Sequence, residues 1–320
     1  MFERNICYAT QGALFHPGAQ EMLEPAWDYN LYYRADGQPL VFYEDTFEEW
    51  KARGVDAHSI VADPLFVNAD ACDFRPKPES PAFKLGFTPF DFSQAGLEGP
   101  REWVEMPKAA TFKPTVLPPA PAPPQPTQVD DGFETTAVGE PPALAEVSGE
   151  EKDASIRITD EAAANGKHSL KVTDAPNLSH DWEPHFFYRP NFKKGIALCS
   201  FDLRLEKGAT LSHEWRDWRR NPFDIGPSIQ VDAKGQVIVN NKTLMTIPCG
   251  QWVRFEIVCP LGDKATGSYD LAITSPGQES KVFKGVPCGS ARFKAVTWAG
   301  FISTATDKAV FYLDNVRLHD

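Results

Sequence analysis

A proline-rich stretch constrains this chain more than any other feature of its sequence. Residues 104–129 read VEMPKAATFKPTVLPPAPAPPQPTQV, with prolines at positions 107, 114, 118, 119, 121, 123, 124 and 126. Each proline fixes φ, removes a backbone N–H and pushes the preceding residue out of the α region. We therefore predict an extended, polyproline-like linker over residues 99–128, between an N-terminal piece (1–98) and a C-terminal domain (129–320).

Charge and hydropathy narrow the function classes. The formal net charge is −12 and the sequence pI is about 5.1, which disfavours a nucleic-acid partner because phosphate neutralisation needs a basic face. The sequence has no apolar run of membrane-spanning length. The first residues, MFERNICYAT, lack the basic and apolar regions of a signal peptide.

The cysteines do not form a metal-binding or redox motif. Six cysteines are present and no pair has CxxC spacing. The tripeptide Pro-Cys-Gly occurs at residues 248–250 and again at 287–289. Cys249 and Cys288 are therefore either a disulfide pair or two separate loop thiols, and the sequence leaves both readings open.

The N-terminal piece contains two loosely similar segments. Residues 5–8 read NICY and residues 30–33 read NLYY, each followed by a turn containing glycine and a second short apolar strand. Short strands at such spacing, with Asn and Gly at the corners, are typical of β-solenoid coils. Thr46 and Glu49 predict a capping box for a short helix that ends at Gly54.

The order of motifs along residues 1–98 resembles the C-terminal end of right-handed parallel β-helix proteins of the pectate-lyase-like superfamily. The segments that carry this resemblance are GVDAHS (54–59), DPLF (63–66), SPA (80–82) and GF (86–87). It implies polysaccharide-active relatives, among them secreted lyases and glycoside hydrolases, and an extracellular or periplasmic location. In such proteins the catalytic groups lie on middle coils, so we expect the catalytic coils to be largely missing from this sequence.

Carboxylates in the same piece offer an alternative site. Glycoside cleavage needs two carboxyl groups that face one bond, and an acid/base set can be drawn from Asp28, Asp56, His58, Asp63 and Asp73. The competing interpretation is that these side chains bind backbone donors at turns, as Asp commonly does.

The C-terminal domain is patterned almost entirely as strands. Cys199, Phe201, Leu203 and Leu205 alternate with polar residues, a period of two. The segment DAKGQ (232–236) predicts a hairpin between strands near 229–231 and 237–239. We predict an antiparallel β-sandwich of jelly-roll type, so that the whole chain is all-β.

The ends of this domain resemble carbohydrate-binding modules and laminin-G-like or concanavalin-like sandwiches. The matching segments are DDGFE (130–134), NGKHSL (165–170) and YLDNV (312–316). In several such modules a structural Ca²⁺ joins the first and last strands. The resemblance implies Glu134, the carbonyl of Lys167 and Asp314 as its ligands, and Ca²⁺ prefers mixed carboxylate and carbonyl oxygens. The alternative is that these carboxylates satisfy only turn backbone.

Aromatic, basic and histidine residues gather between residues 180 and 220, in HDWEPHF (180–186) and HEWRDWRR (213–220). Aromatic faces stack on sugars, and guanidinium groups pair with carboxylate or sulfate oxygens. A glycan surface is one interpretation, and core packing with covering ion pairs is the other. A metal site on His180, His185, His213 and Glu214 is a third. The residues predicted to contact glycan are Trp182, His185, Trp215, Arg216, Trp218 and Arg219.

Three functional readings follow. The first is the carbohydrate-binding accessory region of a polysaccharide-active β-helix protein, with the sandwich contacting an acidic or sulfated glycan. The second is a polysaccharide lyase or glycoside hydrolase whose catalytic coils are largely missing here. The third is a structural, cell-surface appendage. Glycan binding without turnover would favour the first and turnover would favour the second.

Overall fold

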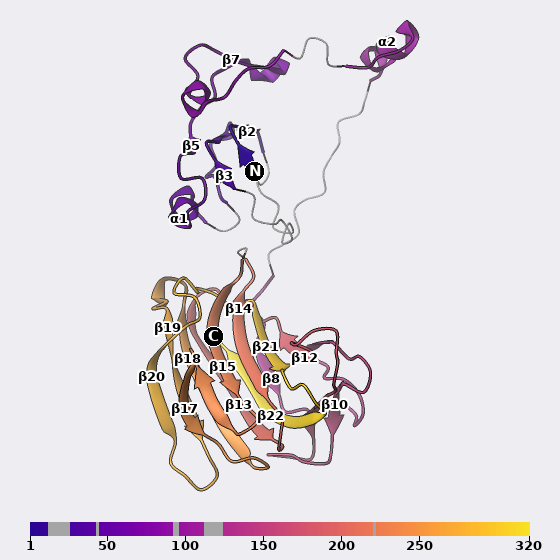
Figure 1. Ribbon diagram of the computed structural model, residues 1–320, viewed down its shortest axis with the longest axis vertical. Helices are drawn as coiled ribbons and strands as arrows, with labels where there is room; N and C mark the ends of the chain where they lie inside the picture. Colours follow the sequence, from indigo (N-terminus) through magenta and orange to yellow (C-terminus); the bar gives the residue numbers. More distant parts are fainter. Residues whose placement is uncertain (12–25, 43–44, 92–95, 112–123, 220–221) are drawn as a thin grey trace. The chain divides into compact units, whose positions relative to one another are not determined.

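The structure is a computed structural model that describes residues 1–11, 26–42, 45–91, 96–111, 124–219 and 222–320. The chain divides into two compact units, residues 1–123 and residues 124–320, whose elements are labelled in Figure 1. None of the helices in the described ranges has the length and apolar character needed to cross a bilayer.

The N-terminal unit contains short strands that pair in parallel. Its elements are β1 (Phe2–Glu3), β2 (Ile6–Ala9), β3 (Trp27–Asp28), β4 (Leu31–Arg34), α1 (Phe47–Ala52), β5 (Ile60–Val61), β6 (Phe66–Asn68), β7 (Asp73–Pro76), the 3₁₀ turns η1 (Ala69–Ala71) and η2 (Pro81–Leu85), and α2 (Arg101–Ala109). β1 pairs with β3, and β2, β4 and β5 form a three-stranded sheet. The two similar segments found in the sequence are thus aligned side by side, with Ile6 opposite Leu31.

Helix α1 forms as the sequence predicts. The Thr46 side chain accepts the N–H of Glu49 while the Glu49 carboxylate accepts the N–H of Thr46, a complete capping box. The helix ends before Gly54, whose φ of +82° is a conformation that side chains disfavour. Its buried residue, Trp50, packs in a small core with Tyr32 and Phe42.

The predicted start of the extended linker, at residue 99, is wrong. Residues 101–109 form helix α2, and Pro107 lies inside it. The segment before Pro107, REWVEM, consists mostly of good helix formers, and Pro107 falls in the last turn, where it removes one hydrogen bond close to the helix end. The densest part of the proline stretch, residues 112–123, lies outside the described residues.

The C-terminal unit is an antiparallel β-sandwich. Its elements are β8 (Val129–Asp131), β9 (Glu146–Ser148), β10 (Ser155–Thr159), β11 (Ser169–Asp174), β12 (His185–Tyr188), β13 (Gly195–Leu205), β14 (Leu211–Asp217), β15 (Asp224–Val231), β16 (Gln236–Val239), β17 (Lys242–Thr246), β18 (Trp252–Leu261), η3 (Gly262–Lys264), β19 (Ser268–Thr274), β20 (Lys281–Pro287), β21 (Trp298–Ser303) and β22 (Ala309–His319).

Two sheets make up the sandwich. One has the strand order β10-β11-β22-β13-β18-β19-β20, with β8 paired to β22, and the other has the order β17-β16-β15-β14-β21-β12-β9. The chain passes from one sheet to the other on either side of β9, β12 and β21, between β13 and β14, and between β17 and β18. The predicted all-β sandwich is confirmed.

The local pattern of the sequence sets the core. The alternating residues of β13, Cys199 to Leu205, are buried in one large cluster with residues from both sheets. The predicted hairpin joins β15 to β16, with Val231 opposite Val237. The two Pro-Cys-Gly motifs do not form a disulfide, because Cys249 is an exposed thiol and Cys288 is a buried one that contacts Cys259.

Candidate functional site

The outward face of the seven-stranded sheet carries a row of aromatic and charged side chains. On β12 and β14 the residues alternate between the core and this face, as a pleated strand requires. Trp298 of β21 lies opposite Arg216 of β14, and Gly300 lies opposite Phe187 of β12. These pairings bring Phe187, Trp298 and Arg216 together from three neighbouring strands.

Trp298 lies flat along the sheet at the centre of this row. A Cβ built on Gly300 would meet the indole ring at 2.0 Å, so glycine is required for this ring to lie there. Phe187 stacks on the indole with ring centroids 5.4 Å apart, and the Arg216 guanidinium lies 4.2 Å from the indole centroid. Arg216 is also 4.7 Å from the ring of Phe223, so its charge is held between two aromatic faces.

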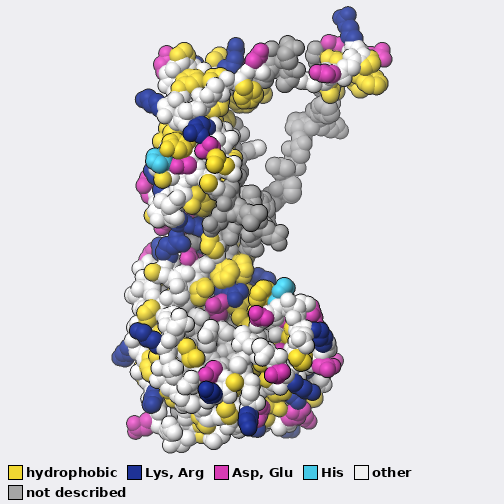
Figure 2. All heavy atoms as spheres, in the orientation of Figure 1, with side chains coloured by type: hydrophobic (Ala, Val, Ile, Leu, Met, Phe, Trp, Pro, Cys, Tyr) yellow, Lys and Arg dark blue, Asp and Glu magenta, His cyan; other side chains and the backbone are white. Residues whose placement is uncertain are grey.

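The cations near this face already have partners. Arg216 Nε donates to Glu214 Oε2 at 2.5 Å, and Arg219 binds both oxygens of Asp217 at 2.8 and 2.7 Å. Basic and acidic side chains are interspersed over the visible face of the C-terminal unit in Figure 2. An anionic ligand of Arg216 would therefore have to replace Glu214 as its partner.

Trp182 and His180 form an exposed platform in the loop before β12. Their rings are stacked, with centroids 4.4 Å apart and an interplanar angle of 4°, and Trp182 is 53% exposed. The carbonyl of Trp182 hydrogen-bonds the Nδ1 of His185 at 3.1 Å, which ties the platform to the first residue of β12. One face of the Trp182 indole is covered by His180, and much of the rest is open to a ligand.

His185 lies between the platform and the aromatic row. Burial is the main reason that its pKa is lowered, and the nearby Arg216 charge acts in the same direction. The hydrogen bond to Trp182 and the carboxylate of Glu183 oppose that shift. His185 is therefore mostly neutral at pH 7, with an uncharged ring available for hydrogen bonding.

The structure places the side chains predicted to contact glycan in different environments. Trp182 and His185 lie at the platform, and Trp218 packs on Phe223 beside Arg216. The prediction for Trp215 is wrong: it is 0% exposed in the core. Its position on β14 falls in the inward register, where its indole N–H donates to His213 Nε2 at 3.0 Å.

Arg219 has a structural role, and two residues of the proposed metal site, His213 and Glu214, face opposite sides of the sheet. Arg219 neutralises Asp217, which is fully buried. His213 faces the core while Glu214, the next residue on β14, faces the opposite side of the sheet. In the described part of the chain no group of three or more His, Cys, Asp or Glu side chains is arranged to hold a metal ion.

Sequence reasoning missed Phe187 and Trp298. Phe187 is visible as the outward residue of an alternating strand, HFFY, but it lies among other aromatics. Trp298 lies 82 positions after Arg216 along the chain and is brought beside it only by strand pairing. No local pattern in the sequence indicates that contact.

The carboxylates proposed for acid/base chemistry do not converge. Asp28 Oδ2 lies 2.7 Å from His58 Nδ1, and Asp63 and Asp73 accept backbone N–H groups two residues further on. Asp56 is buried and accepts side-chain donors from the small core. These contacts match the alternative reading, in which each carboxylate satisfies its own surroundings.

The residues proposed for calcium meet at one loop. Glu134 Oε1 accepts the N–H groups of Lys167 and His168 at 2.8 and 2.9 Å, and Asp314 Oδ2 accepts those of residues 164–165 at 2.8 and 3.1 Å. These bonds lower the pKa of Glu134, whereas burial raises that of Asp314. The contacts supply N–H donors and not the six to eight oxygens that Ca²⁺ takes, so calcium binding stays a prediction.

Chelation tests the calcium prediction. If Ca²⁺ binds the native state between Glu134 and Asp314, it stabilises that state by about 2.7 kcal/mol at a hundredfold excess over Kd. We then expect EDTA to lower the melting temperature of the C-terminal unit and Asp314→Asn to abolish that sensitivity. A melting curve that EDTA leaves unchanged would assign both carboxylates to anchoring the loop alone.

Comparison with solved structures finds proteins of low sequence identity and low structural similarity to this chain. No protein-family model matches the sequence, and no curated protein matches it. An endo-β-1,4-glucuronan lyase from the fungus Trichoderma reesei aligns over 60% of this chain and 94% of its own, with 11% identity and a TM-score of 0.41. The cellulose-induced protein Cip1 aligns over 60% and 96%, with 16% identity and a TM-score of 0.42.

A carbohydrate-binding module gives a similar result. The CBM22-1 xylan-binding domain of Xyn10C from Paenibacillus barcinonensis aligns over 62% of this chain and 97% of its own, with 15% identity and a TM-score of 0.32. Similarity of this size does not by itself assign an activity or a ligand to this chain.

Proposed function

We propose that this chain binds a polysaccharide through the C-terminal sandwich, with Trp182 as the main contact. The observation that carries the proposal is the exposed, stacked pair of Trp182 and His180 beside the aromatic row of the seven-stranded sheet. An indole held rigidly by a second ring loses little conformational entropy when a sugar stacks on its open face. His185 and Glu183 stand next to it as hydrogen-bonding groups.

The finer proposal is that the glycan is acidic or sulfated and that Arg216 binds its anionic group. Arg216 is the cation whose charge reaches His185, and its guanidinium is oriented by the rings of Trp298 and Phe223. Bidentate binding of a carboxylate or sulfate suits a fixed guanidinium. Glu214 competes for the same group, so the pair would exchange partners on binding.

For the N-terminal unit we propose the last coils of a right-handed parallel β-helix. Parallel pairing of β2 with β4 and of β4 with β5 supports this, as do the aligned Asn5 and Asn30 side chains. Together with the family resemblance of residues 1–98, it makes the chain the carbohydrate-binding accessory region of a polysaccharide-active protein. An extracellular or periplasmic location belongs to the same proposal.

Substitution of Trp182 is the direct test. We expect Trp182→Ala to weaken binding to at least one of alginate, pectin and sulfated galactan about tenfold or more in affinity electrophoresis, because a central stacked Trp dominates such contacts. Trp103→Ala is a matched control, since Trp103 is 59% exposed in the N-terminal unit. Full binding by folded Trp182→Ala would place the site elsewhere.

Glu214→Gln separates acidic from neutral glycans. Removing the carboxylate frees Arg216, so an anionic glycan should bind more tightly and the binding of a neutral glucan should be unaffected.

The same panel of glycans is assayed for new reducing ends and for the unsaturated products of lyases. Turnover would replace the binding proposal by the enzyme reading, and the absence of both binding and turnover would favour a structural appendage.

A further inference from the structure

In the three-stranded sheet of the N-terminal unit, no strand pairs with the outer edge of β2 within the described residues. In the pairing of β2 with β4, the N–H of Leu31 donates to the carbonyl of Asn5 and the N–H of residue 35 to that of Ala9. This register directs the N–H and C=O groups of Ile6 and Tyr8 away from β4. They face the other edge of β2, where the described chain places no strand.

A ladder of side chains ends at the same edge. Asn5 donates its backbone N–H and its side-chain Nδ2 to Asn30 Oδ1, at 3.0 and 3.1 Å. In the next coil, the backbone N–H of Asn30 donates to Ser59 Oγ at 2.8 Å. Each coil thus donates to an oxygen of the coil that follows it. Asn5 Oδ1 occupies the position of Asn30 Oδ1 one coil earlier, and within the described residues no donor reaches it.

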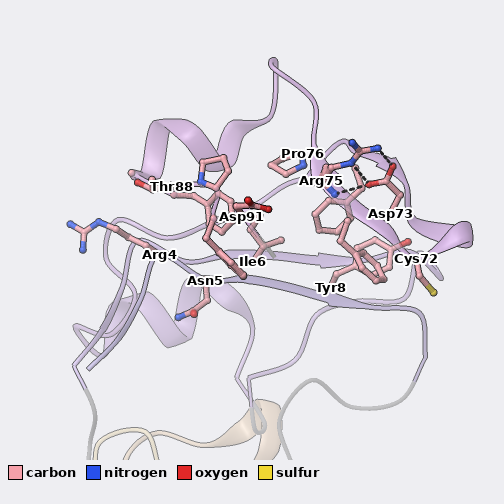
Figure 3. A pocket seen from close by; sticks show the side chains of 16 residues that line it. Arg4, Asn5, Ile6, Tyr8, Cys72, Asp73, Arg75, Pro76, Thr88 and Asp91 are labelled. Atoms are coloured by element: carbon pink, nitrogen blue, oxygen red, sulfur yellow. Dashed lines mark hydrogen bonds and ion pairs between the residues drawn. The ribbon is translucent and has the colours of Figure 1, made fainter. Parts of the chain in front are cut away.

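A pocket of about 1240 Å³ lies over the outward side chains of β2. Ile6 and Tyr8 line it, and the hairpin of β6 and β7 and residues 86–91 form its other walls. Figure 3 shows Arg4 and Arg75 at opposite ends of this pocket, with Ile6 and Asp91 between them. The neighbouring Leu31 of β4, by contrast, is completely buried.

The walls of this pocket present aromatic rings to solvent. Phe74 and Phe90 are 48% and 73% exposed, and Phe74 packs edge-on against Phe66. Tyr8 contacts Phe66 as well, with ring centroids 5.4 Å apart. The open backbone edge, the unfilled end of the ladder and the partly covered apolar walls therefore lie together on one strand.

We propose that this edge of the N-terminal unit docks an additional parallel strand of polypeptide with the pattern Asn-aliphatic-x-aromatic. The Asn of that strand donates its N–H and Nδ2 to Asn5 Oδ1, as Asn5 does to Asn30. Its backbone pairs with the free groups of Ile6 and Tyr8. Its aliphatic and aromatic side chains enter the pocket beside Ile6 and Tyr8 of β2. This is strand addition to an exposed sheet edge, and it is independent of glycan binding.

Peptides test the proposal on the complete, unaltered chain. The probe is a capped, fluorescent peptide with the sequence DYNLYYRA of residues 28–35, because that segment already has the required pattern. We expect saturable binding by anisotropy. The peptide in which Ala replaces the Asn should bind about tenfold more weakly, since the Nδ2 hydrogen bond to Asn5 Oδ1 is lost and only the backbone one remains. A second peptide is N-methylated at the first Tyr of Tyr-Tyr and at the Arg, equivalent to residues 32 and 34, because their N–H groups would face β2. This peptide should not bind.

Hydrogen exchange locates the binding edge. The parent peptide should slow exchange of the Ile6 and Tyr8 amides, which are not used in pairing with β4, and should bind Trp182→Ala equally well. Equal binding of the parent and N-methylated peptides, or no saturable binding, would overturn the proposal. So would a dimer of the chain that the peptide does not dissociate, because a second copy would then occupy the edge.

Discussion

Replacing Asp56 by Asn is expected to unfold much of the N-terminal unit while leaving the sandwich intact. Asp56 is fully buried, and its carboxylate accepts from Asn30, Tyr32, Trp50 and Ser59. The hydroxyl of Tyr32 and the indole N–H of Trp50 share Oδ2, at 2.9 and 2.8 Å. An amide nitrogen cannot accept either bond, so the change leaves buried donors unpaired.

The size of this effect follows from the cost of unpaired groups. Each buried donor without an acceptor costs ~1–3 kcal/mol, so we expect a loss of ~2–4 kcal/mol in the free energy of unfolding of this unit. Asn suits the test because Asp56 has a φ of +52°, a backbone conformation that Asn tolerates. The backbone would therefore not account for the loss.

Hydrogen exchange resolved along the chain is the appropriate measurement, because two units need not unfold in one transition. Amides of residues 26–61 should exchange much faster in Asp56→Asn, and those of β13 and β18 should not change. Asp63→Asn is the matched control, since Asp63 is exposed and accepts one backbone N–H. Equal exchange in the two variants would show that the Asp56 network does not hold the unit together.

The parts of the fold that depend on local pattern were predictable. The alternation in β13 predicted its buried side, and turn residues predicted the hairpin of β15 and β16. Thr46 and Glu49 predicted α1 because a capping box is a contact between residues three apart. In each case the side chains that decide the structure are neighbours in the sequence.

The parts that depend on register were not predictable. The inward residues of β14 are Leu211, His213, Trp215 and Asp217, and two of them are polar. Burial of His213 and Asp217 is possible because Gly300 and Arg219 satisfy them, and those partners cannot be deduced from alternation. Trp215 was therefore assigned to the surface although it lies in the core.

The buried His213 should make the sandwich less stable as the pH falls. Its Nδ1 bonds the carbonyl of Gly300 at 2.9 Å and its Nε2 accepts the indole N–H of Trp215 at 3.0 Å. The ring is thus neutral, with its proton on Nδ1. Protonation of Nε2 would set two N–H groups against each other, and burial adds to that cost. Burial lowers the pKa of His213 from 6.5 to about 3.

The direction of the effect follows from proton linkage. Below pH 6.5 the unfolded chain binds a proton at His213 and the folded chain does not, until the pH nears 3. The stability contributed by the neutral ring is therefore complete above pH 6.5 and is lost as the pH falls through that window, by up to ~1.4 kcal/mol per pH unit. Between pH 7 and pH 4.5 we expect a loss of ~2–3 kcal/mol from this residue.

The measurement is a comparison of slopes between the natural chain and His213→Gln, in which the side chain keeps a donor and an acceptor but cannot titrate. Asp131, Asp174 and Asp314 have pKa values raised by burial, so they act in the opposite direction as the pH falls. Their contributions are common to both proteins and cancel in the difference. Exchange of the β14 amides at pH 7, 5.5 and 4.5, corrected for the intrinsic rate, should show stability falling more steeply in the natural chain. Parallel pH profiles would mean that His213 takes up its proton without unfolding the sandwich.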